Sequence, residues 1–305
     1  MPGKAVNTNP WPWLAMIAAP AFFSTNLIFG RSLADEMDPF VLAFTRWALV
    51  ALLLTPFVLR SAPEARAIVR EHWRLLLALG FLGMWISGAI VYLALHHTSA
   101  INATLIYTTS PVMIVLIEAL FYGRRIGLRE IFGMAIAFCG VALIVLKGDI
   151  GALASLRLNP GDMMIALAAL SWAAYSVLYR SPALKALPNL AVFGLVAWAG
   201  TLCLLPAVVW VALDGGAIVP AAAAWPRIAG LVLLSSLAAF GLFQFGVRAL
   251  GASLTGIFMY MMPPYGVLMA IVFLGETLER FHIVGIIAVL SGIVLATFPV
   301  AMLKR

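Results

Sequence analysis

Apolar runs long enough to cross a lipid bilayer follow one another along the whole chain. A helix needs about 20 residues to cross roughly 30 Å of hydrocarbon, and ten runs of about that length, separated by charges, proline or glycine, occur in the 305 residues. They cover approximately residues 13–30, 39–59, 73–95, 100–122, 128–146, 162–179, 190–213, 226–247, 254–274 and 281–302. Because backbone in lipid must satisfy its own hydrogen bonds, the runs predict an all-α membrane protein with ten transmembrane helices.

The overall composition excludes a soluble fold. Hydrophobic residues make up 64% of the chain and charged residues 10%, whereas soluble domains have roughly 45–50% and roughly 25%. A mean hydropathy of +1.07 is also typical of a chain that is solvated mainly by lipid. We therefore expect the lipid bilayer to surround most of the protein.

The positive charges are unevenly distributed between the two sides of the predicted membrane. With the N-terminus in the cytoplasm, thirteen of the 19 lysines and arginines fall in cytoplasmic segments and five on the other side, which leaves Arg46 inside a run. Cytoplasmic loops carry an excess of Lys and Arg, so the distribution predicts that both termini lie in the cytoplasm. The net charge of +7 then reflects membrane orientation, and no nucleic-acid partner is expected.

The chain repeats itself with an offset of 152 residues. Without a gap, this offset places Trp73 on Trp225, Pro111 on Pro263, Gly123 on Gly275, Gly133 on Gly285 and Gly140 on Gly292. Shared composition explains aligned leucines, but it explains aligned Gly, Pro and Trp poorly. We therefore predict two five-helix repeats, residues 1–150 and 151–305, and the odd number of helices makes the second repeat inverted. Inverted repeats around a central site are a recurrent construction of secondary transporters.

Motifs of the common enzyme classes are absent from the sequence. The chain contains no H-E-x-x-H, no cysteine pair at metal-ligand spacing, no G-x-S-x-G and no phosphate-binding G-x-x-x-x-G-K. His96 and His97 are adjacent and so point to different sides of a helix, which favours an interfacial anchor over a metal site. We expect no enzymatic activity, no cofactor and no metal ion.

Two ionisable residues lie inside predicted spans, where a charge costs about 2.5–3.5 kcal/mol on insertion scales. Arg46 lies about 10 Å into the second span, where it either binds a substrate carboxylate or holds helix ends together through backbone carbonyls. Glu118 lies about one turn from the end of the fourth span, where it either pairs with Arg124 and Arg125 or carries protons. The structural interpretation is favoured for Arg46, because no acidic residue in a span is an obvious partner for it. The ion pair is favoured for Glu118, because Arg124 and Arg125 lie close in the sequence.

Prolines mark positions where three of the spans can bend. Pro20, Pro111 and Pro263 interrupt the first, fourth and ninth runs, and each removes a backbone hydrogen bond. Because Pro111 and Pro263 are equivalent in the repeat, they are the best candidates for hinges between inward-open and outward-open states. A static kink in a packed helix is an equally good interpretation.

Aromatic and small polar side chains share helical faces in several spans. Rings away from the membrane interface, mixed with hydroxyls and amides, suit a cavity for a small amphipathic molecule, although ordinary helix packing explains each residue taken alone. The candidate substrate-binding residues are Ser24, Asn26, Trp85, Tyr92, Asn102, Tyr107, Trp172, Tyr175, Ser176, Phe240, Gln244 and Tyr260.

These features resemble the EamA-type transporters of the drug/metabolite transporter superfamily. The resemblance covers essentially the whole chain and rests on Pro263, Gly275-Glu276, Gly285 and Gly292, on the first-half residues Pro111, Gly123, Gly133 and Gly140, and on Arg46, which matches an arginine common in the family's second helix. Arg124 stands where the first half is expected to have an acidic residue, which counts against any role that needs matched acids in both halves.

The resemblance implies ten helices in two inverted five-helix repeats, with a central cavity formed by helices 1 to 4 and 6 to 9. Helices 5 and 10 are then peripheral. The aromatic content also makes the chain similar to YddG-type exporters, which move aromatic and other amino acids.

Taken together, the sequence predicts an inner-membrane exporter of small amphipathic metabolites, with amino acids favoured, that works by alternating access. Multidrug efflux of organic cations is an alternative, in which Glu118 or the cluster of Asp35, Glu36 and Asp38 would be necessary. A lipid-modifying enzyme is a further alternative, but the polar catalytic pair that it needs is not found. The coupling ion and the oligomeric state are left open, with a monomer favoured.

Overall fold

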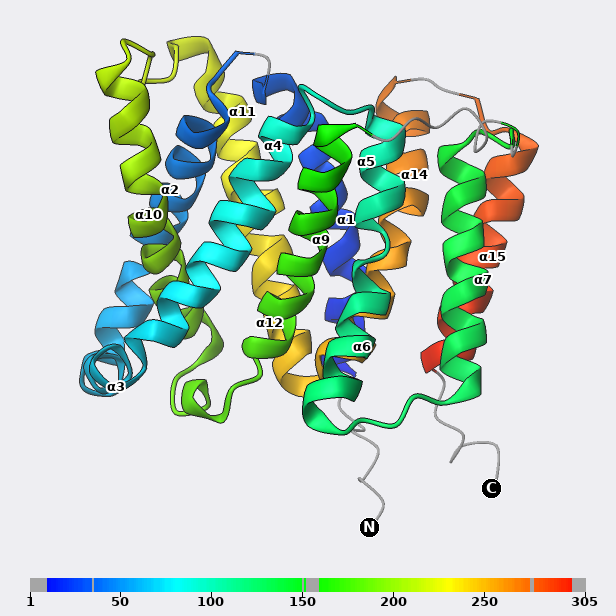
Figure 1. Ribbon diagram of the computed structural model, residues 1–305, viewed down its shortest axis with the longest axis horizontal. Helices are drawn as coiled ribbons and strands as arrows, with labels where there is room; N and C mark the ends of the chain where they lie inside the picture. Colours follow the sequence, from blue (N-terminus) through cyan, green and yellow to red (C-terminus); the bar gives the residue numbers. More distant parts are fainter. Residues whose placement is uncertain (1–9, 35, 150, 152–158, 275–276, 298–305) are drawn as a thin grey trace.

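The computed structural model describes residues 10–34, 36–149, 151, 159–274 and 277–297. Within these ranges the chain is helical and contains no β-strand. Figure 1 shows the helices running alongside one another in a bundle, and the start of α1 (Trp11–Ala34) and the end of α15 (Arg280–Thr297) lie at the same end. The predicted all-α class is confirmed.

The first half of the chain forms the helices that follow α1. They are α2 (Pro39–Arg60), α3 (Ala62–Gly80), the π-helix η1 (Phe81–Ile90), α4 (Val91–Ala94), α5 (Ala100–Tyr107), α6 (Ser110–Tyr122) and α7 (Leu128–Val145). The Asp38 carboxylate caps α2 by accepting hydrogen bonds from the backbone N–H of Phe40 at 2.8 Å and of Val41 at 3.2 Å. Pro39 fills the first helical position, where no N–H is needed.

The second half contains the remaining helices. They are α9 (Pro160–Leu178), the 3-10 helix η2 (Pro182–Leu184), α10 (Asn189–Leu213), the 3-10 helix η3 (Ala222–Ala224), α11 (Trp225–Gly230), the π-helix η4 (Leu231–Ala238), α12 (Ala239–Leu250), α13 (Ala252–Ile257), the 3-10 helix η5 (Phe258–Met261), α14 (Met262–Leu274) and α15. Asn159 and Asp162 form a capping box that starts α9.

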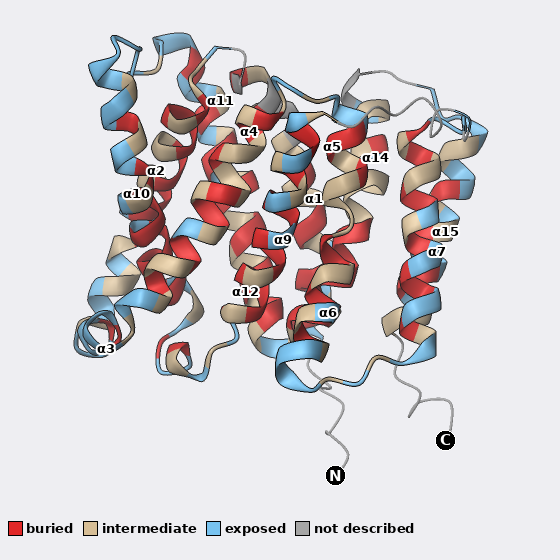
Figure 2. Cartoon of the chain, viewed as in Figure 1, coloured by how far each residue is buried: buried red, intermediate tan, exposed pale blue. Residues whose placement is uncertain are grey.

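The outer surface of the bundle is apolar. Leu120, Phe121 and Leu213 are 78%, 77% and 81% exposed, whereas buried residues face neighbouring helices (Figure 2). In the part of the chain that the structure describes, nine helical segments are long and apolar enough to cross a membrane, and α1 is a further helix of 24 residues. Since a large apolar surface is unfavourable in water, the chain is a multi-pass membrane protein.

The segment that the sequence left between the second and third predicted spans, residues 60–72, is helical as well. α3 begins at Ala62, directly after α2, and buries Ala65 and Ile68 on one face. Its backbone is interrupted at His72, where φ is −126°. This helix is amphipathic, with its apolar residues on one side, and a search for uninterrupted apolar runs overlooks such a pattern.

Helix boundaries in the two halves recur with the offset found in the sequence. α5, α6 and α7 begin at residues 100, 110 and 128, and α13, α14 and α15 begin at residues 252, 262 and 280. The π-helices η1 and η4 also lie in corresponding segments, between α3 and α4 and between α11 and α12. The repeat in residue types is thus accompanied by a repeat in backbone conformation.

Glycines bring α7 and α15 into close contact. A Cβ atom added to Gly133 would lie 2.6 Å from the carbonyl oxygen of Gly292, and one added to Gly140 would lie 2.7 Å from the carbonyl oxygen of Gly285. With the offset of 152 residues, Gly285 is the repeat equivalent of Gly133 and Gly292 is the repeat equivalent of Gly140. Gly133 therefore contacts the equivalent of Gly140, and Gly140 contacts the equivalent of Gly133. The glycines of the two helices thus contact one another crosswise.

Filling this contact is expected to destabilise the protein. Gly140→Leu would force a side chain against backbone atoms and push α7 away from α15, at a cost of about 1–3 kcal/mol. Thermal unfolding of the purified protein in detergent measures the effect as a lower melting temperature. Gly127→Ala is the matched control, because nothing lies within 4 Å of the added Cβ atom. Equal melting temperatures for the two variants would contradict the prediction.

Candidate functional site

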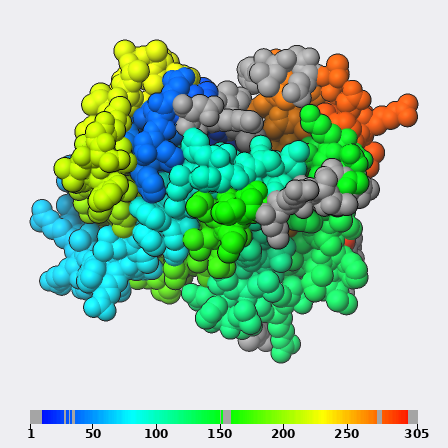
Figure 3. Space-filling model, turned by 45° about the horizontal axis from the view of Figure 1, so that its top comes forward, coloured from blue at the N-terminus to red at the C-terminus, as the bar shows by residue number. Residues whose placement is uncertain are grey.

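A cavity of about 600 Å³ lies inside the bundle, between helices from both halves of the chain. Its walls come mainly from α1, α2, η1, α4, α5 and α9, with contributions from α6, α12, η5 and α14. The connection between α4 and α5 forms its mouth, where His96, Ser99 and Ala100 are exposed. This connection lies on the face that Figure 3 turns forward. We call this side the open end.

The opposite side of the cavity is blocked by packed polar side chains. Tyr175, Gln244 and Tyr260 are fully buried, and Tyr179 is 1% exposed. The Gln244 amide donates a hydrogen bond to the Tyr175 hydroxyl, and the Tyr179 hydroxyl donates one to Gln244 Oε1 at 3.0 Å. The exposed residues among those that line the cavity, His96, Ser99 and Ala100, all lie at the open end. We call the end that contains the packed polar side chains the closed end.

Arg46 supplies a buried positive charge to the cavity wall. Its side chain is 5% exposed, and its Nε donates a hydrogen bond to Ser236 Oγ at 2.6 Å. Nη1 donates to the Tyr92 hydroxyl and Nη2 donates to the Ser235 carbonyl oxygen, each at 2.9 Å. The Tyr92 hydroxyl in turn donates a hydrogen bond to Asn26 Oδ1 at 3.0 Å. The guanidinium thus links α2 to η4, α4 and α1.

The charge of Arg46 has no anionic partner in the described part of the chain. None of the described carboxylates forms an ion pair with it, and no described lining residue is aspartate or glutamate. A guanidinium carries five N–H groups, so one on each terminal nitrogen is left over after the three hydrogen bonds above. A buried cation with unused donors favours an anionic ligand.

The wall next to Arg46 is aromatic. The ring centre of Phe240 lies 5.2 Å from that of Phe23, 4.7 Å from that of Trp47 and 5.3 Å from that of Trp172. The guanidinium carbon of Arg46 lies 5.0 Å from the centre of the Trp47 ring, which is a cation–π distance. A cation and several rings in one cavity suit a molecule with an anionic group and an apolar part.

Comparison with known proteins identifies the family. The sequence pattern of the EamA-like transporter family matches residues 10–146 and, a second time, residues 159–298. The chain belongs to the EamA-like transporter family. The family predicted from the sequence is therefore confirmed.

Relatives of this EamA-like chain are named as transporters. It is 23% identical to the uncharacterized transporter YetK of Bacillus subtilis, over 95% of this chain and 88% of that one. It is 30% identical to an uncharacterized transporter of Archaeoglobus fulgidus, over 89% of this chain and 92% of that one. A probable terminal-alkyne amino-acid exporter of Streptantibioticus cattleyicolor is 30% identical over 65% of this chain and 64% of its own length. These names indicate a transporter rather than an enzyme.

A solved crystal structure has the same fold as this EamA-like chain. The two superimpose with a TM-score of 0.75, at 20% sequence identity, over 96% of this chain and 99% of the other. At this level of identity the likeness concerns the fold alone.

About half of the residues that the sequence proposed for the site line the cavity of this EamA-like protein. They are Asn26, Arg46, Tyr92, Tyr107, Pro111, Trp172, Phe240 and Pro263. The others, which the structure places outside the lining, are Pro20, Ser24, Trp85, Asn102, Glu118, Tyr175, Ser176, Gln244 and Tyr260. Asp35 and Gly275-Glu276, which the sequence also singled out, lie outside the described residues.

Local contacts explain why several of these side chains do not face the cavity. Trp85 stacks on Phe81 with ring centres 5.1 Å apart. The Ser176 hydroxyl donates to the Trp172 carbonyl oxygen at 2.7 Å, and the Ser24 hydroxyl lies 3.0 Å from the Met262 carbonyl oxygen. These residues share helices with the lining residues but contact neighbouring helices or their own backbone.

Glu118 lies in an ion-pair network at the closed end. Its carboxylate is 3% exposed and accepts hydrogen bonds from Arg180 and Ser253, and Arg124 Nε lies 3.6 Å away. The structure thus places Glu118 beside Arg124, as the sequence suggested, whereas Arg125 is exposed. The contacts with Arg180 and Ser253 were missed because both residues are distant in the sequence. The network joins α6 to the end of α9 and to the start of α13.

Asp162, at the start of the sixth predicted span, is a buried acid. It is 2% exposed and accepts hydrogen bonds from the Thr98 hydroxyl and from Asn102 Nδ2, the latter at 3.1 Å. These bonds tie α9 to the beginning of α5 at the open end. The Asn-Pro-Gly-Asp pattern at 159–162 indicates a helix cap, but no local pattern in the sequence shows that Asn102 is a hydrogen-bond partner of Asp162.

Several lining residues were not proposed from the sequence. Phe23 and Trp47 face the cavity, and so do Ser87 and Gly88 of η1. The position of Trp47 directly after Arg46 is the one signal that would have drawn attention to it. The π-helical geometry of η1 decides which of its side chains point inward, and the apolar pattern does not predict a π-helix.

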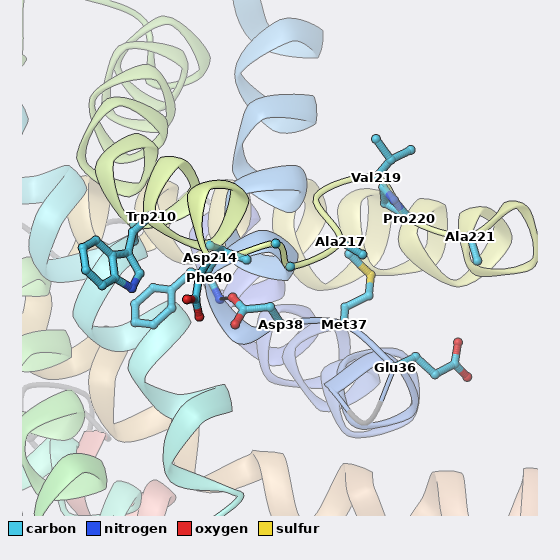
Figure 4. Close-up of a pocket in the computed structure, with 14 residues that line it drawn as sticks. Glu36, Met37, Asp38, Phe40, Trp210, Asp214, Ala217, Val219, Pro220 and Ala221 are labelled. Carbon is cyan, nitrogen blue, oxygen red and sulfur yellow. Dashed lines mark hydrogen bonds between the residues drawn. The ribbon is translucent and has the colours of Figure 1, made fainter.

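A second pocket of about 840 Å³ lies outside the central cavity, between the start of α2 and the loop that follows α10. Figure 4 shows that Glu36 points away from the carboxylates of Asp38 and Asp214. Glu36 accepts two hydrogen bonds of 2.7 Å from Arg227, and this contact lowers the pKa of the Glu36 carboxyl. Among the described residues no group of three or more His, Cys, Asp or Glu side chains could hold a metal ion.

Proposed function

We propose that this protein exports small amphipathic metabolites, with amino acids including aromatic ones as substrates, across the bacterial inner membrane. The observation that carries the proposal is the central cavity, in which the buried charge of Arg46 adjoins a wall formed by Phe23, Trp172 and Phe240. A carboxylate fits the cation, and an apolar or aromatic side chain fits the rings. A relative of 30% identity that is named as an amino-acid exporter supports the same substrate class.

The proposed architecture has ten transmembrane helices in two inverted five-helix repeats, residues 1–150 and 151–305. In this scheme the spans are α1, α2, α3 to α4, α5 to α6, α7, α9, α10, α11 to α12, α13 to α14, and α15. Three observations support it: the family pattern matches the chain twice, helix starts recur at a constant offset, and the glycines of α7 and α15 meet crosswise.

The proposed orientation has both termini in the cytoplasm. It follows from the excess of arginine and lysine on that side. In this orientation the open end of the cavity faces the periplasm and the closed end faces the cytoplasm, so the described conformation is outward-open. Export by alternating access requires a second conformation in which the closed end opens and the mouth at the α4 to α5 connection closes.

The proposed hinges are the breaks next to Pro111 and Pro263. α5 ends at Tyr107 and α6 starts at Ser110, whereas the 3-10 helix η5 separates α13 from α14. Both prolines line the cavity, and both lie where backbone hydrogen bonding is already interrupted. A change of angle at these breaks would move one half of each helix while the other half stays packed, which is the movement that alternating access needs. Pro20 is a third candidate, inside α1.

Flux into and out of proteoliposomes tests the proposed function. Vesicles that contain the purified protein and are loaded with unlabelled phenylalanine should accumulate labelled phenylalanine and tryptophan faster than protein-free vesicles, with threonine and methionine as further substrates. If none of the four amino acids moves in either direction, the amino-acid proposal fails.

Efflux of organic cations is less compatible with the cavity. Its described lining contains a buried guanidinium and no carboxylate, so a permanently charged cation would meet repulsion without a counter-charge. In the same assay a labelled tetraalkylammonium ion is expected not to accumulate, and its accumulation would favour the multidrug alternative.

A further inference from the structure

The indole N–H of Trp47 is a buried donor without an acceptor. Trp47 is 1% exposed and lines the cavity, and its Nε1 atom has no hydrogen-bond partner among the described residues. A buried polar group without a hydrogen-bond partner is destabilising. Such a donor in the wall of a binding cavity indicates that a ligand supplies the acceptor.

The position of Gly88 leaves room for an acceptor beside this nitrogen. Gly88 also lines the cavity, and a Cβ atom added to it would lie 3.4 Å from Trp47 Nε1. Any larger residue would occupy the space next to the N–H group, so the indole N–H is directed toward the volume that the missing side chain leaves free. Gly88 lies in the π-helix η1, which supplies this part of the wall.

Trp47 and Arg46 both line the cavity and both keep unused hydrogen-bond donors. They are neighbours in α2, and the guanidinium carbon of Arg46 lies 5.0 Å from the centre of the Trp47 ring. Arg46 keeps one unused N–H on each terminal nitrogen, and Trp47 keeps its indole N–H. Because Trp is a donor only and Arg is a donor with a permanent charge, the pair offers no acceptor to an ammonium group.

We propose that Arg46 and Trp47 form a binding site for a carboxylate, with Gly88 keeping the space for its oxygen atoms open. The inference rests on the proposed function, because it assumes that the cavity holds the substrate. It adds a substrate class: molecules with a carboxylate are selected over the corresponding amines and alcohols. It also assigns Trp47 a role through its N–H group and not only through its ring.

Other buried atoms without partners do not form an equivalent site. The hydroxyls of Thr255 and Tyr260 also have no described partner, but neither residue is among those that line the cavity. Trp47 is thus distinguished by two independent observations, its unpartnered N–H and its place in the wall beside a cation.

Binding of four related compounds tests the carboxylate site. L-phenylalanine, 3-phenylpropionate, 2-phenylethylamine and L-phenylalaninol share a ring and differ in their charged groups, and their binding to the full-length protein is measured by ligand-induced shifts in melting temperature. We expect the affinity for the two carboxylates to be higher than that for the amine and the alcohol by about tenfold or more. Trp47→Phe and Gly88→Ala should each remove most of this preference.

Trp198→Phe is the matched control for these variants. The Trp198 indole N–H already donates to Thr55 Oγ1 at 3.1 Å, and the residue is not among those that line the cavity. Its replacement should leave the preference for carboxylates unchanged. If Trp47→Phe retains the full preference while phenylalanine is still transported, the carboxylate site is refuted and the proposed function stands. If the wild-type protein binds none of the four compounds, both are refuted.

A spectroscopic titration reads the indole N–H directly and does not depend on transport. In protein labelled with ¹⁵N in its nine tryptophans, the Trp47 signal is identified by its absence in Trp47→Phe. Benzoate should shift this signal and leave that of Trp198 in place, whereas benzylamine should shift neither. A Trp47 signal that benzoate does not move, or that benzylamine moves equally, overturns the proposal.

Discussion

Arg46→Gln is expected to lower amino-acid flux into proteoliposomes by about 100-fold or more. The substitution removes the positive charge and both unused N–H groups on the terminal nitrogens. A hydrogen bond to a charged group contributes about 1.5–3 kcal/mol, so the loss of two such bonds to a substrate carboxylate weakens binding by at least about 100-fold. The measurement is the initial rate of labelled phenylalanine uptake at a concentration well below saturation.

The structural contribution of Arg46 must be separated from its contact with substrate. The residue also donates to Ser236, to Tyr92 and to the Ser235 carbonyl oxygen, so the variant's melting temperature is measured first. Arg46→Lys keeps the charge but offers one nitrogen in place of three, and an intermediate flux is expected. Arg70→Gln is the matched control, because this exposed arginine lies outside the cavity. A folded Arg46→Gln protein with wild-type flux contradicts the proposed role.

The helices of this fold were predictable because a membrane restricts the choice of structure so strongly. Each run of about 20 apolar residues has one stable solution in lipid, a helix, and runs such as 39–59 and 128–146 became α2 and α7 with small changes at the ends. The sequence did not predict the π-helical segments within spans, η1 and η4. Local hydrogen-bond shifts produce these elements, and they leave the apolar pattern unchanged.

A residue of the candidate site was predictable only where its own type, placed inside a span, already has an energetic cost. Arg46 was singled out because a charge inside a span is costly, and the structure places it in the cavity wall. Trp47 and Gly88 gave no such signal, because their significance depends on one unpartnered N–H and on the space next to it. The contacts of Glu118 with Arg180 and of Asp162 with Asn102 join residues about 60 positions apart, and one sequence without relatives does not show such pairs.

Glu118→Gln is expected to open the closed end of the bundle. The Glu118 carboxylate on α6 binds Arg180 after α9 and Ser253 on α13, so it ties one half of the chain to the other below the cavity. Breaking a buried ion pair costs about 3–5 kcal/mol, but the Arg180 side chain is 43% exposed and solvent reduces the effect. A shift of about tenfold in the equilibrium between closed and open states is therefore expected.

Cysteine labelling measures this opening. Ser176 is fully buried at the closed end, and the chain has two native cysteines, Cys139 and Cys203, which are first replaced by alanine. In this background Ser176→Cys should react about tenfold faster with a membrane-impermeant maleimide when Glu118→Gln is present. Glu71→Gln is the matched control, because Glu71 pairs with Arg70 and both side chains are exposed to solvent.

The same variant distinguishes a structural ion pair from a proton carrier. If Glu118 holds the closed end together, Glu118→Gln changes labelling of Ser176→Cys and keeps the pH dependence of phenylalanine flux, because no proton has to pass through this residue. A proton carrier gives the opposite result, in which the pH dependence disappears and labelling stays the same. Since Glu118 is not among the residues that line the cavity and three polar partners surround its carboxylate, the first outcome follows from the geometry.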